Sequence, residues 1–190
     1  MKQFFTLLSL LGSSLLLQAQ DFETGSNYMS FISKQQENVS KKYLSYSSAA
    51  AHGKRAKKVD ALREKLLNEV QEAKMNVSGM PAFKGDKAYR DTAISFMKLY
   101  YNVLNDDYAK IINMEEVAEQ SYDAMEAYML AQELVDKKLK EANEMMQLGQ
   151  KNFASNNNIN LLKDESKLGE MLEQVHQTNE HYKKVYLLFL

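Results

Sequence analysis

The sequence predicts an all-α protein, an antiparallel bundle of four to five long helices. The chain has 190 residues with one proline and seven glycines, so few residues interrupt a helix. Apolar side chains recur at steps of three and four residues over most of its length, which is the period of a helix with one buried face. No segment shows the alternating β-branched pattern of a strand. These observations together favour helices joined by short loops.

The first half of the chain contains two apolar stripes. Residues 20–26 read as a short mobile lead, and Ser26 or Asn27 is suited to cap the first helix. Gly53 interrupts the pattern, so the stripes form either two helices or one long helix kinked near Gly53. The inward-facing residues expected are Tyr28, Phe31, Ile32, Val39, Tyr43 and Tyr46, then Val59, Leu62, Leu66, Val70, Ala73 and Val77.

A loop over residues 76–86 contains the only proline, and Asp86 is suited to cap the next helix. That helix is aromatic-rich, and a further helix is expected to restart at Asn113, with Glu116 completing a capping box. The restarted helix should fade between Gly149 and Ala154. The inward-facing residues expected are Tyr89, Ala93, Phe96, Met97, Tyr100, Tyr101, Leu104, Tyr108 and Ile111, then Val117, Tyr122, Met125, Met129, Leu134, Val135, Leu139, Ala142 and Met146.

The polar segment 155–160 predicts a turn, and the last helix is expected to begin near Asp164. Its apolar residues are spaced to face the core. They are Leu168, Met171, Leu172, Val175, Tyr182, Val185, Tyr186 and Phe189.

The N-terminus is typical of a secretory signal peptide. Lys2 supplies the positive charge, an apolar run comes next, and small residues lead to Ala19. We expect cleavage after Ala19, which divides the chain into a signal peptide over residues 1–19 and one helical-bundle domain over residues 20–190. The apolar run is short for a membrane span, so no transmembrane segment is expected after cleavage. An uncleaved N-terminal anchor is the alternative.

The composition excludes several kinds of chemistry. Without cysteine the chain has no disulfide, thiolate metal site or cysteine nucleophile. It contains neither a Gly-x-Ser-x-Gly elbow nor a glycine-rich nucleotide-binding motif. No cofactor is therefore expected, and the chain is not predicted to be an enzyme. Near-neutral net charge gives little attraction for polyanions, so no nucleic-acid partner is expected either.

One stretch, "EQVHQTNEHYKK" at residues 173–184, resembles a metal site. Glu173, His176 and Glu180 are spaced to share one helix face. Glu-x-x-His on a bundle helix is the ligand element of di-iron carboxylate proteins, but such a site uses two of these elements and the chain offers one. The alternatives are a metal-binding bundle that uses Glu173, His176 and Glu180, or an ordinary polar helix face.

Charge is unevenly distributed along the chain. Residues 34–65 carry nine Lys or Arg and three acids, whereas residues 105–144 carry eleven acids and four Lys. Lys54, Arg55, Lys57 and Lys58 could bind an anionic envelope surface such as lipopolysaccharide or lipid. The alternative is complementary charge between neighbouring helices, which would set their order in the bundle.

The chain resembles an uncharacterised family of exported, all-helical surface proteins from Bacteroidetes and Leptospira. The resemblance lies in the general character of the mature chain, with "YMSFISKQQENVSKKY" and "YYNVLNDDYAKI" as its most suggestive pieces. It carries no activity or site residues to transfer. It implies an exported helical bundle in the periplasm or on the cell surface, with a non-catalytic binding or scaffolding role. The expected partner is another protein or an envelope component, and self-association is left open.

Overall fold

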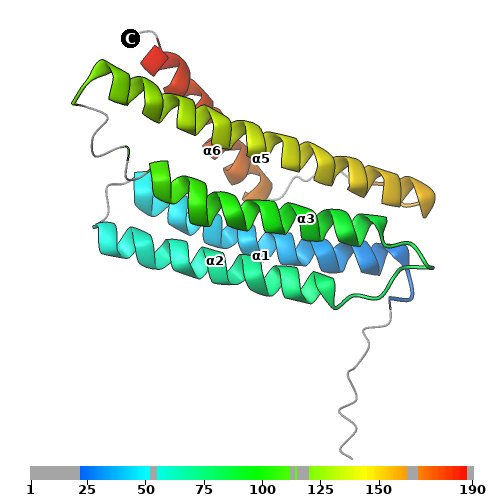
Figure 1. Ribbon diagram of the computed structural model, residues 1–190. Helices are drawn as coiled ribbons and strands as arrows, with labels where there is room; N and C mark the ends of the chain where they lie inside the picture. The colour runs from blue at the N-terminus through cyan, green and yellow to red at the C-terminus, as the bar shows by residue number, and fades with distance from the viewer. Residues whose placement is uncertain (1–21, 52–54, 112–113, 115–119, 162–166, 188–190) are drawn as a thin grey trace, which may run out of the picture.

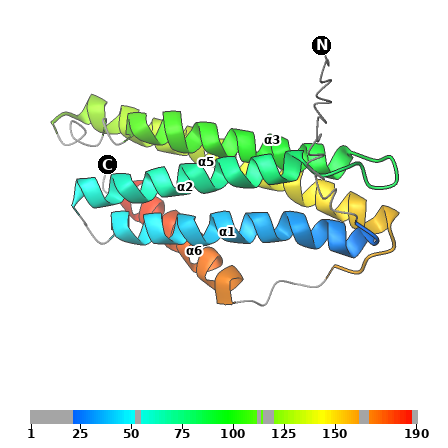
Figure 2. The same cartoon turned by 90° about the horizontal axis from the view of Figure 1, so that it is seen from below.

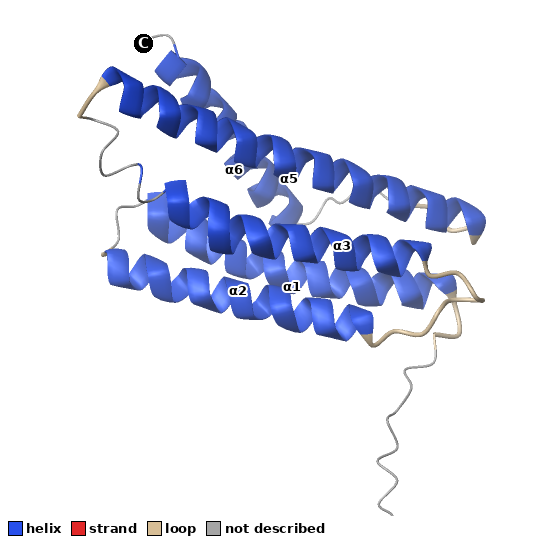
Figure 3. Ribbon diagram, viewed as in Figure 1, coloured by secondary structure: helices blue, strands red, loops and turns tan. Residues whose placement is uncertain are grey.

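A computed structural model of the chain describes residues 22–51, 55–111, 114, 120–161 and 167–187. Within its helices, the side chains of residues 50, 51, 56, 176, 179–180 and 182–187 lie outside this description. The described elements are the helices α1 (Gly25–Ala51), α2 (Ala56–Ser78), α3 (Ala88–Asn102), α5 (Tyr122–Asn156) and α6 (Lys167–Leu187) and a π-helical turn, η1 (Val103–Asp107). No strand occurs in the described part of the chain, so the all-α prediction is confirmed (Figure 3).

Helices α1, α2 and α3 lie side by side and antiparallel to their chain neighbours (Figure 1). The first two stripes therefore belong to two separate helices rather than to one kinked helix. Helix α5 lies on α3 and runs back in the opposite direction, and α6 crosses α1 obliquely (Figure 2). The result is a three-helix core with α5 packed on its α3 side and α6 packed on its α1 side.

The main core matches the predicted stripes of α1, α2 and α3. Ile32, Leu66, Val70 and Val77 are completely buried, and Met97 nearly so. They belong to one contiguous apolar cluster that α5 completes with Met146, Phe153 and Ala154. Burial of a large aliphatic side chain contributes about 1.5–3 kcal/mol, so this cluster supplies most of the drive for folding.

A second, smaller core joins the end of α3 to the first half of α5. Val103, Ile111 and Val135 are its buried residues. The π-turn η1 places Val103 and Leu104 both in the interior. The extra residue of a π-turn rotates the next helical residues around the helix axis, and such an insertion is not visible in a 3.6-residue pattern.

Two of the predicted helix starts differ from those observed. The cap of α1 is Thr24, whose Oγ1 accepts the N–H of Asn27 at 3.1 Å, and not Ser26 or Asn27. The predicted cap Asn113 lies outside the described residues. Helix α5 begins instead after Ser121, whose side chain accepts the N–H of Ala124 at 3.2 Å. The predicted lead is also shorter than expected, because Phe22 already packs on the core.

For three residues in the second half of the chain, the predicted inward orientation is wrong. Tyr122, Leu134 and Met171 were expected to face inward, but all three are exposed. On α6, Leu168, Leu172 and Val175 are only half-buried. Helix α6 packs mainly against α1 and contributes no residue to either buried cluster among the described side chains. Its apolar stripe therefore has fewer neighbours than its amphipathic pattern predicts.

Candidate functional site

The predicted metal element lies on α6. Glu173 is exposed, and its Oε1 accepts the side-chain N–H of Gln177 at 2.9 Å. His181 is exposed, while the side chains of His176 and Glu180 lie outside the described residues. The described residues contain no group of three or more His, Asp or Glu arranged to hold a metal. The metal site stays a prediction, and elemental analysis after purification without chelators tests it, because stoichiometric iron, manganese or zinc is expected if it is correct.

The predicted basic patch lies at the start of α2. Arg55, Lys57 and Lys58 are exposed, and Lys54 lies outside the described residues. The start of a helix carries positive partial charge, so these cations gain nothing from their position within the fold. None of the ion pairs between described residues joins the basic segment to the acidic one: Arg63–Asp60 lies within the first and Lys138–Asp107 within the second, while Arg90–Asp91 lies between them in sequence. Binding of an anionic surface stays a prediction.

The loop between α2 and α3 is the most elaborate local structure in the described chain. Lys84 and Gly85 both have positive φ, 50° and 84°, and the flanking Phe83 and Asp86 exchange two backbone hydrogen bonds of 2.9 Å. This is a two-residue hairpin turn. The predicted cap Asp86 accepts the N–H of Ala88 through Oδ1 at 2.7 Å. Ala88 is the first residue of α3, and Lys87 stands between it and Asp86.

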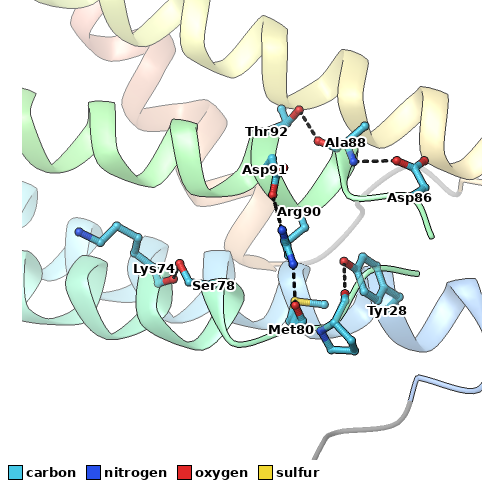
Figure 4. A network of polar contacts seen from close by, with 10 residues as sticks. Tyr28, Lys74, Ser78, Met80, Asp86, Ala88, Arg90, Asp91 and Thr92 are labelled. Atoms are coloured by element: carbon cyan, nitrogen blue, oxygen red, sulfur yellow. Dashed lines mark hydrogen bonds and ion pairs between the residues drawn. The ribbon is translucent and has the colours of Figure 1, made fainter. Parts of the chain in front are cut away.

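Side chains from two helices anchor this loop (Figure 4). The Tyr28 hydroxyl of α1 donates to the Pro81 carbonyl at 3.0 Å, and Arg90 Nη1 of α3 donates to the Met80 carbonyl at 2.9 Å. Asp91 Oδ1 in turn accepts from Arg90 Nε and Nη2. These hydrogen bonds satisfy the backbone carbonyls of Met80 and Pro81, which lie outside the helices, and they hold the loop in one position.

An aromatic cluster underlies the loop. Phe153 of α5 packs on Tyr28, Phe83 and Tyr89 with ring centroids 5.2–5.5 Å apart. A shallow cleft of about 210 Å³ opens beside these rings, and it is lined by Phe22, Glu23, Tyr28, Pro81, Ala82, Phe83 and Lys84. Small-molecule sites generally enclose about 300–1,000 Å³, so the cleft is small for a ligand. The Tyr28 phenol that lines the cleft already donates a hydrogen bond to the Pro81 carbonyl.

A tyrosine group links α1 with α3 and the segment after η1. The Tyr43 and Tyr100 rings lie 6.3 Å apart, and the Tyr46 and Tyr108 rings 6.5 Å apart. Burial raises the pKa of the Tyr43, Tyr100 and Tyr108 phenols above the usual value of 10. These ring contacts pack α1 against α3 and the segment after η1.

Several of the exposed large apolar side chains in the described part of the chain lie along one side of α5. Leu130, Leu134, Met145 and Leu148 are 59%, 56%, 53% and 59% exposed. At 100° per residue these four lie within about 60° of arc on the helix, forming one stripe. The buried residues of α5, such as Val135 and Phe153, lie about 110° away around the axis. We call the four exposed residues the outer stripe of α5.

Sequence reasoning missed the outer stripe because it assigned α5 a single apolar face. Leu134 was placed in the core, and Leu130, Met145 and Leu148 were not assigned to a face. A helical projection would have shown two apolar stripes on one helix. A monomeric soluble protein seldom leaves a run of large apolar residues on a regular helix in water.

The chain matches no protein-family model, no curated protein and no solved structure. Among the described helices, none combines the length and the apolar character required to cross a lipid bilayer.

Proposed function

We propose that the protein is an exported, non-catalytic binding or scaffolding module of the cell envelope or cell surface, and that it contacts its partner through the outer stripe of α5. The observation that carries the proposal is the exposure of Leu130, Leu134, Met145 and Leu148 on a helix whose other face is already packed on α3. Helix α5 spans 35 residues, which is about 52 Å, and lies along one edge of the molecule (Figure 1).

The energy available at this surface is substantial. Each of the four side chains is already partly covered by its own helix, so its burial contributes about 1 kcal/mol. Together they supply about 4 kcal/mol on one side of an interface. An apolar helix face that docks on a partner helix is a common recognition mode. By contrast, the cleft beside Phe83 is small for a ligand.

The N-terminal sequence supports export. Expression of the full chain in a bacterial host, together with fractionation and mass spectrometry, tests this part. The expected result is a mature chain beginning at Gln20 in the periplasmic, surface or extracellular fraction. Full-length protein retained in the cytoplasm would contradict it.

Site-specific photo-crosslinking tests the binding surface. A photoreactive residue at Leu134 should give a discrete adduct of higher mass in cells that express the protein. The control is the same residue at Asn143, which is exposed on a different side of α5. No adduct at Leu134, or equal adducts at both positions, would overturn the proposed role of the stripe.

A further inference from the structure

We infer that the partner of the outer stripe is a second copy of this chain, docked antiparallel along α5. This inference rests on the proposed function, because it identifies the occupant of the same surface. The outer stripe is nearly symmetric along the helix, since two apolar residues, Leu130 and Leu134, are separated from two others, Met145 and Leu148, by a polar centre.

One antiparallel register pairs every residue of the stripe with an apolar residue. Leu130 then lies opposite Leu148 of the second copy, and Leu134 lies opposite Met145 of the second copy. The two-fold axis falls beside residue 139. Each of these contacts occurs twice, so the eight side chains of the two stripes form four apolar layers. A closed interface of this kind is self-complementary, as a two-fold dimer requires.

The charges at the centre of the stripe favour this arrangement. Lys137 and Glu141 lie on the same arc as the outer stripe, within about 20° of Leu130. In the antiparallel register Lys137 lies opposite Glu141 of the second copy, again twice. A parallel pair would place Lys137 against Lys137 and Glu141 against Glu141. Opposite charges in the middle of a helix pair select its orientation, because like charges there are desolvated together.

Other antiparallel registers lose these contacts. Sliding the two copies by one turn in one direction places Leu134 against Glu141 of the second copy, and in the other direction it places Lys137 against Met145 of the second copy.

In the proposed register, Glu126 meets Lys151 of the second copy along one flank, while Glu133 meets Glu144 of the second copy. This last contact is between like charges at the solvent edge, and salt screens it.

The expected interface is small. Burial on the order of 100 Å² for each of eight apolar side chains, together with the flanking stems, places it near 1,200 Å². This is the low end for specific complexes, so the dissociation constant is expected to lie in the micromolar range. Helix α3 packs against the buried arc of α5, about 110° from the outer stripe, so α3 leaves the stripe uncovered for a second copy.

Disulfide trapping tests the arrangement, because the chain contains no cysteine of its own. Leu130→Cys and Leu148→Cys are prepared separately in the mature chain and oxidised with glutathione disulfide, alone and as an equal mixture. Cross-linked dimer is expected in the mixture and not in either variant alone. Cysteines at one position would be about 27 Å apart in the antiparallel pair, far beyond disulfide reach. Dimer formed by Leu130→Cys alone would overturn the antiparallel arrangement.

Sedimentation of the unmodified mature chain supplies the second measurement. Dimer should accumulate between about 1 and 100 µM. Leu134→Glu should weaken association at least about tenfold, whereas Asn143→Glu should leave it unchanged. Circular dichroism of both variants checks that the helices persist. A chain that is monomeric at about 100 µM overturns the inference.

The photo-crosslinked adduct separates this inference from the proposed function. An adduct with the mass of two chains supports both. An adduct with a different protein retains the binding surface and overturns self-association. The absence of any adduct, together with a monomeric chain, overturns both.

Discussion

The crossing of α3 and α5 depends on Gly149. A Cβ built on this glycine would lie 3.0 Å from Thr92 Cγ2, 3.3 Å from Thr92 Cβ and 3.4 Å from Thr92 Oγ1. Favourable contacts between carbon atoms are about 3.5–4.0 Å, so an added methyl group is overpacked. Thr92 has little freedom to withdraw, because its Cβ is one bond from the backbone and its Oγ1 donates to the Ala88 carbonyl at 2.8 Å.

The expected magnitude for Gly149→Ala combines two opposing effects. Alanine in place of glycine within a helix stabilises by about 1 kcal/mol. Overpacking costs about 1–3 kcal/mol, and a central value of about 2 is reasonable for one methyl group against a rigid neighbour. The net expectation is a loss of about 1 kcal/mol in the free energy of unfolding. With a urea m-value of about 2 kcal/mol/M, the unfolding midpoint should fall by about 0.5 M.

A matched control and a double mutant make the test specific. Gly79→Ala is the same substitution at a site without crowding, since the added Cβ would make only ordinary van der Waals contacts of 3.5 and 3.6 Å, and it should be neutral or stabilising. Thr92→Ala removes the two side-chain atoms beyond Cβ, so Gly149→Ala should cost about 1 kcal/mol less in that background. If Gly149→Ala raises the urea midpoint, or if Thr92→Ala does not change its effect, α3 and α5 do not approach as closely as described.

Three further predictions concern the loop end of the bundle. Gly85→Ala places a side chain at φ 84° in open space, so urea unfolding should show a loss of about 1–2 kcal/mol from backbone strain alone; an unchanged midpoint would argue against this hairpin turn. Phe153→Ala removes the ring on which three others pack and should cost about 3–5 kcal/mol, whereas the exposed Met75→Ala should change stability by less than about 0.5 kcal/mol. Burial raises the pKa of Tyr89 to about 12, while the unfolded chain ionises near 10, so the unfolded state loses its proton first. Stability should therefore fall as pH rises from about 10 to about 12, and tyrosinate absorbance should show buried phenols ionising only as the chain unfolds; ionisation of all tyrosines near pH 10 in the folded state would refute this.

The first three helices were predictable because their sequences offer one clear apolar face. On α2 the stripe from Leu66 to Val77 is buried as its spacing predicts. Leu66, Val70 and Val77 lie on one arc, and the charged residues between them lie outside it. A single amphipathic face leaves one way to remove apolar surface from water, so a local pattern suffices.

Helix α5 shows where local reasoning ends. The sequence predicts that this helix fades between Gly149 and Ala154, but α5 continues to Asn156. Gly149 lies within the helix, where its missing side chain leaves room for Thr92 of α3. Tertiary contact therefore outweighs the low helix propensity of glycine. No local rule states that a remote threonine lies at this position.

The candidate site was less predictable than the fold. The only motif with a chemical reading was Glu173 with His176 and Glu180, and Glu173 lies on an exposed face of α6. The outer stripe of α5 carries no motif at all, since Leu134 and Leu148 are typical core residues. Only their exposure in the folded chain sets them apart from core residues.

The sequence by itself determined that this chain is helical and where its first three helices run. Helix formation and amphipathic spacing depend on neighbours within a turn, so they can be read along the chain. Only the tertiary structure decided which of the two apolar faces of α5 is buried. Both faces are apolar in water, and the choice depends on the shape of α3 at a contact about sixty residues away in sequence, where Thr92 meets Gly149.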